Sequence, residues 1–555
     1  MEHLPLADAV ERHVRPGDTV CVAMGHHRWT AAARELCRQH WRADPGFTLV
    51  MPSLGSLGVL FVHGGLVRRT VTAYSGDAFP TYSPNPVFQR GYESGAVEPE
   101  HWSFLTLIRR LEAAALGLPA MPVQPLRGSS LAQNPAYDEI DVDGQPLGIV
   151  RPLAPDVTLL HAVAADRAGN VAIAPPSLDG VAGAFAAKRG CVVTTERVVE
   201  DLSSFAAFTK IPAHRVLAIA PTPFGAHPGG CYATALNLRG YAEDVDAWID
   251  ARTAARGDLD AWAKQWCLDP VTHDRYLESV GAQRLAWLRA RLDPESWRDD
   301  EAAYPVDEVA PPTAWETAAA YSVRELGERI AAIDADAVLA GAGVANLAAW
   351  VAVARARAGG SEVQLMAELG LWGYQPTPAD PSIFNFRAFP SASMLTEAVT
   401  VLGTLVGGPG TRSLGCLGAA QVDAAGNLNS TQLANGRFLV GAGGGTDVAV
   451  GADEVLVVTL LRPERTPERV PYVTAPGDQV QTVVTDLGVL RRRDGELRLA
   501  AVTAGEEPIE ARVQAAVASC GWALGTDRTV AELPSPSYDD VLALRRYDPR
   551  GWFLS

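Results

Sequence analysis

Short apolar runs alternate with glycine-bearing loops and helical periodicity in the first part of the chain. Residues 19–24 predict a buried strand, Gly25 begins the loop after it, and residues 30–40 predict a helix. A second strand is predicted at residues 47–51. Because a strand, a glycine loop and a helix in this order form a crossover between parallel strands, we expect an α/β fold with a largely parallel sheet.

The same pattern returns in the second part of the chain. Residues 338–340 predict a strand, a Gly-Ala-Gly loop follows, and residues 344–358 predict a helix. Just before them, Ser322 and Glu325 have the spacing of a capping box and predict a helix that begins at Ser322. Two halves on one plan predict two similar domains packed around a central cleft, where a ligand would bind.

A segment of different composition lies between the two halves. Residues 240–300 are charged, helical in pattern and rich in tryptophan, and residues 294–312 are acidic and contain prolines. We interpret them as a helical insertion at the end of the first half, followed by a linker. The predicted domains are 1–239, 240–312 and 313–555.

Composition restricts the partners rather than the fold. The 555 residues are 48% hydrophobic and carry a formal net charge of −17, which would repel nucleic acid and anionic membranes. No stretch approaches the length of an apolar membrane span, and the first residues lack the features of a secretory signal. The seven cysteines are scattered without metal-ligand spacing, so we expect free thiols, no metal and a cytoplasmic location.

One carboxylate stands where a buried strand runs into a glycine turn. Residues 362–366 predict the strand, and Glu368 precedes Gly370 and Gly373. Glycines can adopt positive φ and let a ligand approach the backbone, and a carboxylate can act as a covalent nucleophile. The residues alone leave two interpretations open: a solvated turn, or a carboxylate that reaches into a cleft.

Other candidates are a glycine run and several polar or aromatic side chains. The run Gly441-Ala-Gly-Gly-Gly445 offers consecutive backbone N–H groups for an anion, although a glycine run also serves as a tight connection. No lysine follows it as in a phosphate-binding loop. The side chains stand in loops or at a helix entry: His26, His27, Glu100, Trp102 and His227. The alternative to a functional role is, for each of them, an exposed position in a loop or a role in helix capping.

Seven short motifs carry a family resemblance when their order and spacing are taken together. They are VEPEHWSF at 97–104, GLPAMP at 117–122, ADRAGN at 165–170, PFGAHP at 223–228, ELGLWG at 368–373, GAAQVDAAGN at 418–427 and GAGGGTD at 441–447. With them the chain resembles the family I CoA-transferases, in particular the glutaconate CoA-transferase-like branch with its alpha and beta subunits fused. The resemblance covers nearly all of the chain except residues 240–310.

The resemblance implies a CoA-transferase (NagB-like) fold and a double-displacement reaction. Glu368 matches the nucleophile of the family and would form a glutamyl-CoA thioester that a carboxylate acceptor resolves. The family's glycine positions imply oxyanion or CoA-binding roles, carried here by Gly25, Gly370, Gly443, Gly444 and Gly445. Coenzyme A, as acyl-CoA, and a carboxylic acid are then the small-molecule partners, and two fused chains would form a homodimer.

Two departures from the family pattern add candidates for substrate contact. His26 and His27 follow Gly25 where the family has a richer glycine loop, and Trp372 lies close to Glu368. Trp102 and His227, within matched motifs, complete the predicted substrate residues.

Two rival functions remain open on the sequence. In a related branch, enzymes that act on cyclic CoA esters hydrolyse a carbon–carbon bond through a first-half glutamate, which Glu100 matches. One rival is therefore a CoA-thioester hydrolase or a ring-opening hydrolase that uses Glu100, with His101 or His26 assisting a water. A non-catalytic CoA-ester-binding protein on the same fold is the other.

Overall fold

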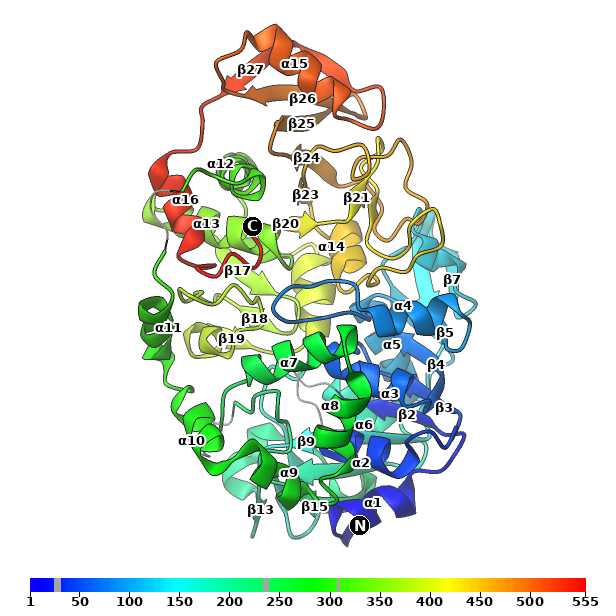
Figure 1. Cartoon of the computed structure of the whole chain (residues 1–555). Helices are drawn as coiled ribbons and strands as arrows, with labels where there is room; N and C mark the ends of the chain where they lie inside the picture. Colours follow the sequence, from blue (N-terminus) through cyan, green and yellow to red (C-terminus); the bar gives the residue numbers. More distant parts are fainter. Residues whose placement is uncertain (24–30, 233–237, 239, 307–309) are drawn as a thin grey trace.

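Two large sheets, built from separate halves of the chain, form two lobes of the molecule (Figure 1). The computed structural model describes every residue except 24–30, 233–237, 239 and 307–309. Helices α1 and α2 pack against the sheet of the first lobe, and α12 and α13 pack against that of the second. The predicted α/β class with two largely parallel sheets is therefore confirmed.

The first lobe contains an eight-stranded sheet in which all neighbouring strands are parallel. Every residue of its central strand β9 is buried, as expected for a parallel sheet covered on both faces. In spatial order the strands are β1 (Glu2–His3), β15 (Val216–Pro221), β12 (Cys191–Thr195), β9 (Val157–Ala162), β2 (Thr19–Val22), β3 (Phe47–Val50), β4 (Val67–Thr72) and β5 (Glu98–His101). The helical segments are α1 (Leu6–His13), α2 (Ala31–His40), η1 (Ser56–Gly58), α3 (Val59–His63), α4 (Pro86–Glu93), α5 (Phe104–Ala115) and α6 (Gly180–Ala186).

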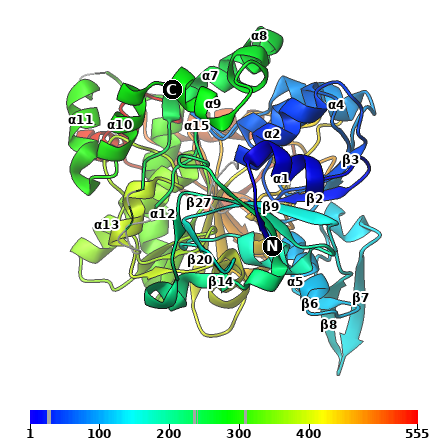
Figure 2. The ribbon, with the colours of Figure 1, turned by 90° about the horizontal axis from the view of Figure 1, so that it is seen from below.

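An antiparallel three-stranded sheet is attached to the first lobe. Its strands are β6 (Met121–Val123), β8 (Gln145–Val150) and β7 (Tyr137–Val142), with β8 in the middle. The hairpin of β7 and β8 projects from the body of the molecule (Figure 2).

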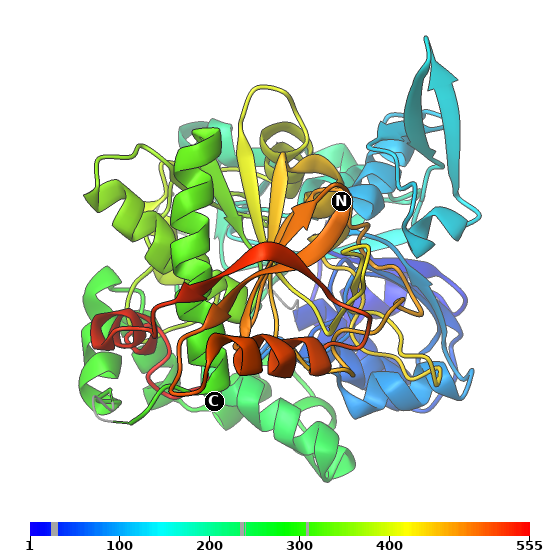
Figure 3. The same cartoon turned by 90° about the horizontal axis from the view of Figure 1, so that it is seen from above.

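The second lobe contains a ten-stranded sheet with a parallel centre. Strands β17, β16, β20, β23 and β24 are mutually parallel, whereas β18, β19, β25 and β26 join in antiparallel pairs. In spatial order the strands are β19 (Met394–Leu395), β18 (Leu371–Trp372), β17 (Gln364–Ala367), β16 (Ala337–Ala340), β20 (Ser413–Gly418), β23 (Glu454–Val458), β24 (Val480–Val484), β25 (Gly488–Arg493), β26 (Glu496–Thr503) and β27 (Gly525–Leu533). The helices are α12 (Ala314–Ile333), α13 (Val344–Ala358), α14 (Gly445–Gly451), α15 (Ile509–Ala518) and α16 (Tyr538–Arg545), and Figure 3 shows α15 beside the last strands.

Each lobe contains a hairpin closed by the same hydrogen bonds. Asp166 accepts from the backbone and the side-chain amide of Asn170, both at 2.8 Å, between β10 (Ala164–Asp166) and β11 (Val171–Ala172). In the second lobe, Asp423 accepts from the same two groups of Asn427 at 2.9 and 3.1 Å. The flanking strands there are β21 (Gln421–Val422) and β22 (Leu428–Asn429). The similarity that the sequence indicated therefore extends to individual hydrogen bonds.

Between the two halves in the sequence, a series of short helices forms what we call the appendage, which runs along the first lobe toward the second (Figure 1). Helix α7 packs on η1 and α4 of the first lobe, and the π-helical turn η6 packs on α2. The segments are α7 (Val245–Arg256), α8 (Leu259–Ala263), η6 (Lys264–Leu268), α9 (His273–Val280), α10 (Ala282–Ala290), η7 (Pro294–Ser296) and α11 (Trp297–Ala303).

The helix expected to begin at Ser322 begins earlier. Helix α12 is capped by Thr313, whose side chain and that of Glu316 form the capping box. Ser322 lies inside the helix, and its hydroxyl donates to the carbonyl oxygen of Ala318 at 2.8 Å. The predicted capping box at Ser322 and Glu325 is therefore wrong.

All seven cysteines are buried and free of disulfides. Among the described residues, no helix has the length and apolar character needed to cross a membrane.

Candidate active site

A cavity of about 600 Å³ is lined by both lobes, and we call it the cleft. The first lobe contributes Tyr74, Tyr82 and Phe104. The second contributes Glu368 and the glycine run from Gly441 to Gly445. A nucleophile candidate and the glycine run therefore share one cavity.

A tight turn places Glu368 in the cleft. Strand β17 ends at Ala367, and β18 returns antiparallel to it after the turn. Gly370 has a φ of +126°, and a Cβ there would overlap the carbonyl oxygen of Thr396. Glycine is thus required at this position, because it allows the chain to reverse immediately after Glu368.

The carboxyl group of Glu368 lies in a poorly solvated setting with one hydrogen-bond donor. Burial, and secondarily the negative charge of Asp447, raise its pKa to about 8, although the N–H of Gly444 donates to it and opposes the rise. No described arginine, lysine or histidine forms an ion pair with it. At neutral pH the group is largely protonated.

The glycine run of the second lobe is held by the backbone of the first. The N–H of Gly443 donates to the carbonyl oxygen of Ala73 at 3.0 Å, and its own carbonyl accepts from the N–H of Phe104 at 2.9 Å. Gly441 pairs with Tyr74, with a φ of +105° that favours glycine. A Cβ at Gly444 would overlap the carboxylate of Glu368. These contacts fix the run against the nucleophile candidate.

Asp447 makes a further contact between the lobes. Its carboxylate accepts from the hydroxyl of Ser103 at 2.5 Å and from the N–H of Leu105 at 3.0 Å. Ser103 is the N-cap of α5, so this acidic residue of one lobe stabilises the start of a helix in the other. Burial raises the pKa of Asp447 to about 7, against these hydrogen bonds.

Glu100 lies in an ion-pair network and is not among the described residues that line the cleft. It ends β5 with His101, and its carboxylate accepts from Arg69 and Arg110, each at 2.5 Å. The indole N–H of Trp102 donates to the same carboxylate at 2.7 Å.

The remaining predicted residues lie in different surroundings. His227 faces a second cavity, where its ring bonds to Tyr276 at 2.7 Å and to Asp244 at 3.1 Å. Trp372 is half-buried in β18, opposite Met366 in the strand register. The predicted residues Gly25, His26 and His27 lie outside the described part of the chain.

Sequence reasoning missed a cation of the cleft. Arg465 lines the cavity, half-buried, with its guanidinium 5.1 Å from the ring centroid of Trp315. No carboxylate within the described ranges forms an ion pair with it. Its position depends on the packing of two segments about 150 residues apart in the sequence, so no local pattern indicates it.

One group of side chains has the chemistry of metal ligands. Donor atoms of His161, Glu196 and Cys231 all lie within 4.8 Å of one another. The Glu196 carboxylate is hydrogen-bonded to His161 and accepts from Tyr241, each at 2.7 Å. Hydrogen bonds therefore satisfy the polar groups of His161 and Glu196, which form a polar network. The spacing of these residues in the sequence did not indicate this network.

The chain is similar to known proteins along both halves. A family described as Coenzyme A transferase matches residues 4–217. The chain is 28% identical over 312 residues to one subunit of glutaconate CoA-transferase from Acidaminococcus fermentans, covering 52% of this chain and 94% of the relative. It is 33% identical over 280 residues to one subunit of 3-oxoadipate CoA-transferase from Pseudomonas knackmussii, covering 48% and 93%.

A further relative and a solved structure extend the likeness. The other subunit of the same 3-oxoadipate CoA-transferase is 26% identical over 208 residues, covering 34% of this chain and 78% of the relative. An acyl-CoA transferase (YdiF) from Escherichia coli superposes with a TM-score of 0.66 over 96% of this chain and 95% of its own, at 14% identity, which shows the fold alone. The length of 555 residues fits a fusion of two such subunits. The chain belongs to the coenzyme A transferase family.

Proposed function

We propose that the protein is a family I CoA-transferase that moves CoA from an acyl-CoA thioester to a carboxylic acid through a glutamyl-CoA intermediate on Glu368. The observation that carries this proposal is the pairing of Glu368 with the N–H of Gly444 in a cleft lined by both lobes. Tight packing against Glu368 allows no side chain at Gly444, so the N–H stands directly beside the nucleophile.

The reaction takes place in two halves, each with the same carboxylate. A deprotonated oxygen of Glu368 attacks the thioester carbonyl, and the tetrahedral intermediate collapses to a mixed anhydride and CoA thiolate. The thiolate then attacks the glutamyl carbonyl of the anhydride, which releases the acyl group as a carboxylate and leaves a glutamyl-CoA thioester. The acceptor carboxylate repeats these steps in reverse and restores free Glu368.

Each step passes through an oxyanion that needs a hydrogen-bond donor. The N–H of Gly444 stands next to Glu368 and supports this role. The N–H groups of Gly441, Gly443 and Gly445 donate to backbone carbonyl oxygens and hold the run in place. A donor that is fixed before the reaction stabilises developing charge without rearrangement. Because backbone contacts from both lobes hold the glycine run, they support catalysis where the two lobes meet.

The protonation of Glu368 sets the pH range of the reaction. Because its pKa of about 8 lies above neutrality, only a minor fraction is ionised and nucleophilic at pH 7. A carboxylate without a neighbouring cation is also less stabilised in its charged form, so the ionised fraction is a stronger nucleophile.

The acyl group that we propose carries a second carboxylate. The two relatives are named for glutaconate and 3-oxoadipate, both dicarboxylates. Arg465, which has no carboxylate partner among the described residues, gives the cleft a cation for such a group or for a phosphate of CoA. The face of Trp315 orients its guanidinium.

The rival hydrolytic reaction at Glu100 gains no support from the geometry. Two arginines and an indole N–H already bind its carboxylate, which is the arrangement of a structural ion pair rather than of a base that activates water. Burial lowers the pKa of His101 to about 4, and its ring stacks on Phe438.

The test is acyl exchange by Glu368→Gln, which keeps the size of the side chain and removes the nucleophile. We expect exchange of labelled carboxylate into acyl-CoA to fall by at least about a thousandfold. Glu362→Gln is the matched control, since Glu362 is exposed just before the same strand, and it retains wild-type exchange. Full exchange by Glu368→Gln would contradict the proposal.

A further inference from the structure

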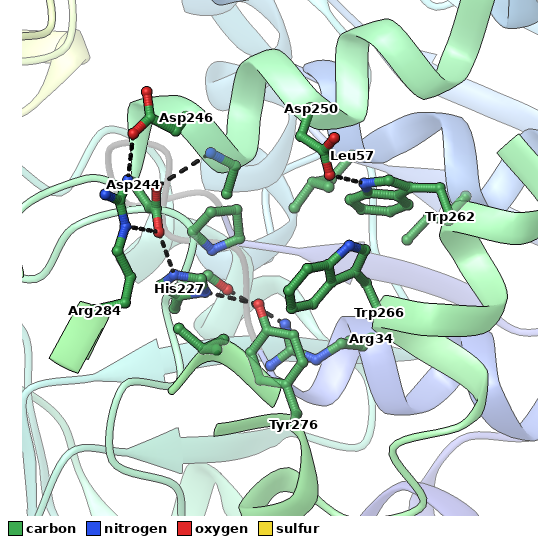
Figure 4. A pocket seen from close by; sticks show the side chains of 14 residues that line it. Arg34, Leu57, His227, Asp244, Asp246, Asp250, Trp262, Trp266, Tyr276 and Arg284 are labelled. Carbon is green, nitrogen blue, oxygen red and sulfur yellow. Dashed lines mark hydrogen bonds and ion pairs between the residues drawn. The ribbon is translucent and has the colours of Figure 1, made fainter. Parts of the chain in front are cut away.

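A second cavity, of about 350 Å³, lies between the first lobe and the appendage (Figure 4). Helix α2 contributes Arg34, η1 contributes Leu57, and the appendage contributes Trp262, Trp266 and Tyr276. None of these side chains takes part in the reaction described above. The volume is that of a small-molecule site, and we call it the appendage pocket.

Arg34 supplies a cation whose hydrogen-bonding capacity is little used by the described residues. Its guanidinium stacks 3.5 Å from the ring centroid of Tyr276. Its side-chain contacts are long ones, 3.3 Å to the carbonyl oxygen of His227 and 3.5 Å to the ring of His273. No carboxylate in the described part of the chain forms an ion pair with it. A half-buried guanidinium in this setting is suited to bind a carboxylate.

Most of the other charged groups of the appendage pocket pair with one another. Asp244 is bound by Arg284 at 2.5 Å and by the ring of His227 at 3.1 Å. Arg284 also binds Asp246, which is exposed. Two arginines and three aspartates line the appendage pocket, so its lining carries a net charge of −1 when the ring of His227 is neutral. Arg284 is paired with carboxylates, whereas Arg34 forms no ion pair with a described carboxylate, and a ligand with one carboxylate matches that guanidinium.

The opposite side of the appendage pocket is aromatic and ends in an acidic rim. Figure 4 shows Trp262 and Trp266 together on one side, across from His227 and Asp244. The indole N–H of Trp262 donates to Asp250 at 2.7 Å, which fixes that ring, and Asp250 itself is exposed at the rim. Two indoles bind a flat apolar body, while the rim carboxylates repel a ligand with several negative charges.

We propose that the appendage pocket is a second ligand site, separate from the cleft, which binds a small monocarboxylate with an aromatic or apolar body. The carboxylate binds the guanidinium of Arg34, and the body packs against Trp262 and Trp266. A phosphorylated ligand is disfavoured by the acidic rim, and a cationic ligand by the guanidinium of Arg34 in the interior. The double-displacement reaction needs no such site, so the inference does not depend on the proposed function.

The test is calorimetric titration of the full chain with phenylacetate, which combines one carboxylate with one aromatic ring. We expect binding with a Kd between about 10 μM and 1 mM, and at least about tenfold weaker binding of the neutral isostere phenylacetamide. Arg34→Gln weakens phenylacetate binding by at least about tenfold. Arg275→Gln, an exposed arginine of α9 paired with Glu278, is the matched control and leaves binding unchanged.

A variant of the cleft separates the two cavities. Arg465→Gln removes the cation of the cleft, and we expect phenylacetate to bind to it as to the wild type. Should Arg34→Gln fail to fold, Trp266→Leu replaces it and is expected to weaken binding by a similar factor. The proposal would be overturned if Arg465→Gln abolished phenylacetate binding, or if Arg34→Gln and Trp266→Leu both left it intact. Absence of binding to the wild type at about 10 mM phenylacetate would also overturn it.

Discussion

Two carboxylates of this protein, the half-buried Glu368 in the cleft and the buried Asp244 at the appendage pocket, have opposite protonation. Burial by itself would raise both pKa values. At Asp244, hydrogen bonds from His227 and Arg284 outweigh burial and hold the pKa well below its usual range. At Glu368, one backbone N–H is the only opposing contact from the described residues, and the pKa rises to about 8. Partners rather than burial decide which carboxylate is permanently ionised and which exchanges a proton near neutrality.

Asp244 and Glu368 therefore have different roles. A permanently ionised and paired Asp244 fixes its neighbours, as its contacts with α10 through Arg284 show. Glu368, which no described cation pairs, lies next to a cavity and is available for chemistry.

Filling the space beside Glu368 should affect catalysis most. In Gly444→Ala the new methyl group overlaps the carboxylate of Glu368 and displaces it or the N–H beside it. We expect kcat for CoA transfer to fall by about a hundredfold or more, at unchanged melting temperature within a few degrees.

The neighbouring glycine provides the control for that substitution. A Cβ at Gly445 meets no atom within 4 Å, so Gly445→Ala should retain nearly full activity. Equal activity of the two variants would show that the contact between Gly444 and Glu368 is not needed.

The pH dependence of transfer follows from the raised pKa of Glu368. Attack requires the ionised form, so kcat/KM should rise about tenfold per pH unit below neutrality and level off above about 8. In Asp447→Asn a repelling negative charge is lost, the pKa of Glu368 falls, and the rising limb moves to lower pH by about one unit. A wild-type limb near pH 4.5 would mean that Glu368 is solvated like an ordinary surface carboxylate.

The smallest expected effect concerns binding alone. Arg465→Gln should raise KM for a dicarboxylic acyl-CoA by about tenfold with little change in kcat, because it removes a binding contact and leaves Glu368 and Gly444 in place. If KM for an acyl-CoA with a neutral acyl chain rises equally, Arg465 binds the CoA phosphates; if only the dicarboxylic substrate is affected, it binds the second carboxylate. Arg469→Gln, an exposed site nearby in sequence, is the control, and unchanged KM values in Arg465→Gln would remove Arg465 from both roles.

Local patterns sufficed for the strands predicted at residues 19–24, 47–51, 338–340 and 362–366, which the structure confirms as β2, β3, β16 and β17, since these depend on residues close in sequence. The turn after Glu368 requires glycine at position 370 because the backbone of Thr396 approaches it closely. The sequence showed the glycine but not this contact. The start of α12 was misjudged because Thr313–Glu316 and Ser322–Glu325 share one spacing, and only packing decides between them.

Contacts between distant segments could not be predicted. The bond from Ser103 to Asp447 joins residues 344 positions apart, and the ion pairs of Glu100 depend on where β4 and α5 pack. Glu100 and Glu368 therefore stood as rival candidates in the sequence, although one is held by arginines and the other is paired with no described cation. The two glutamates differ in the charged groups that lie next to them in the folded chain, and a sequence motif does not encode those neighbours.

The central claim is tested most directly by mass spectrometry of the intact chain after incubation with acyl-CoA and rapid quenching. We expect a CoA adduct formed with loss of the acyl group. The adduct maps to the peptide containing Glu368, disappears with borohydride reduction and is absent in Glu368→Gln. An adduct on another residue, or turnover without any adduct on the chain, would contradict it.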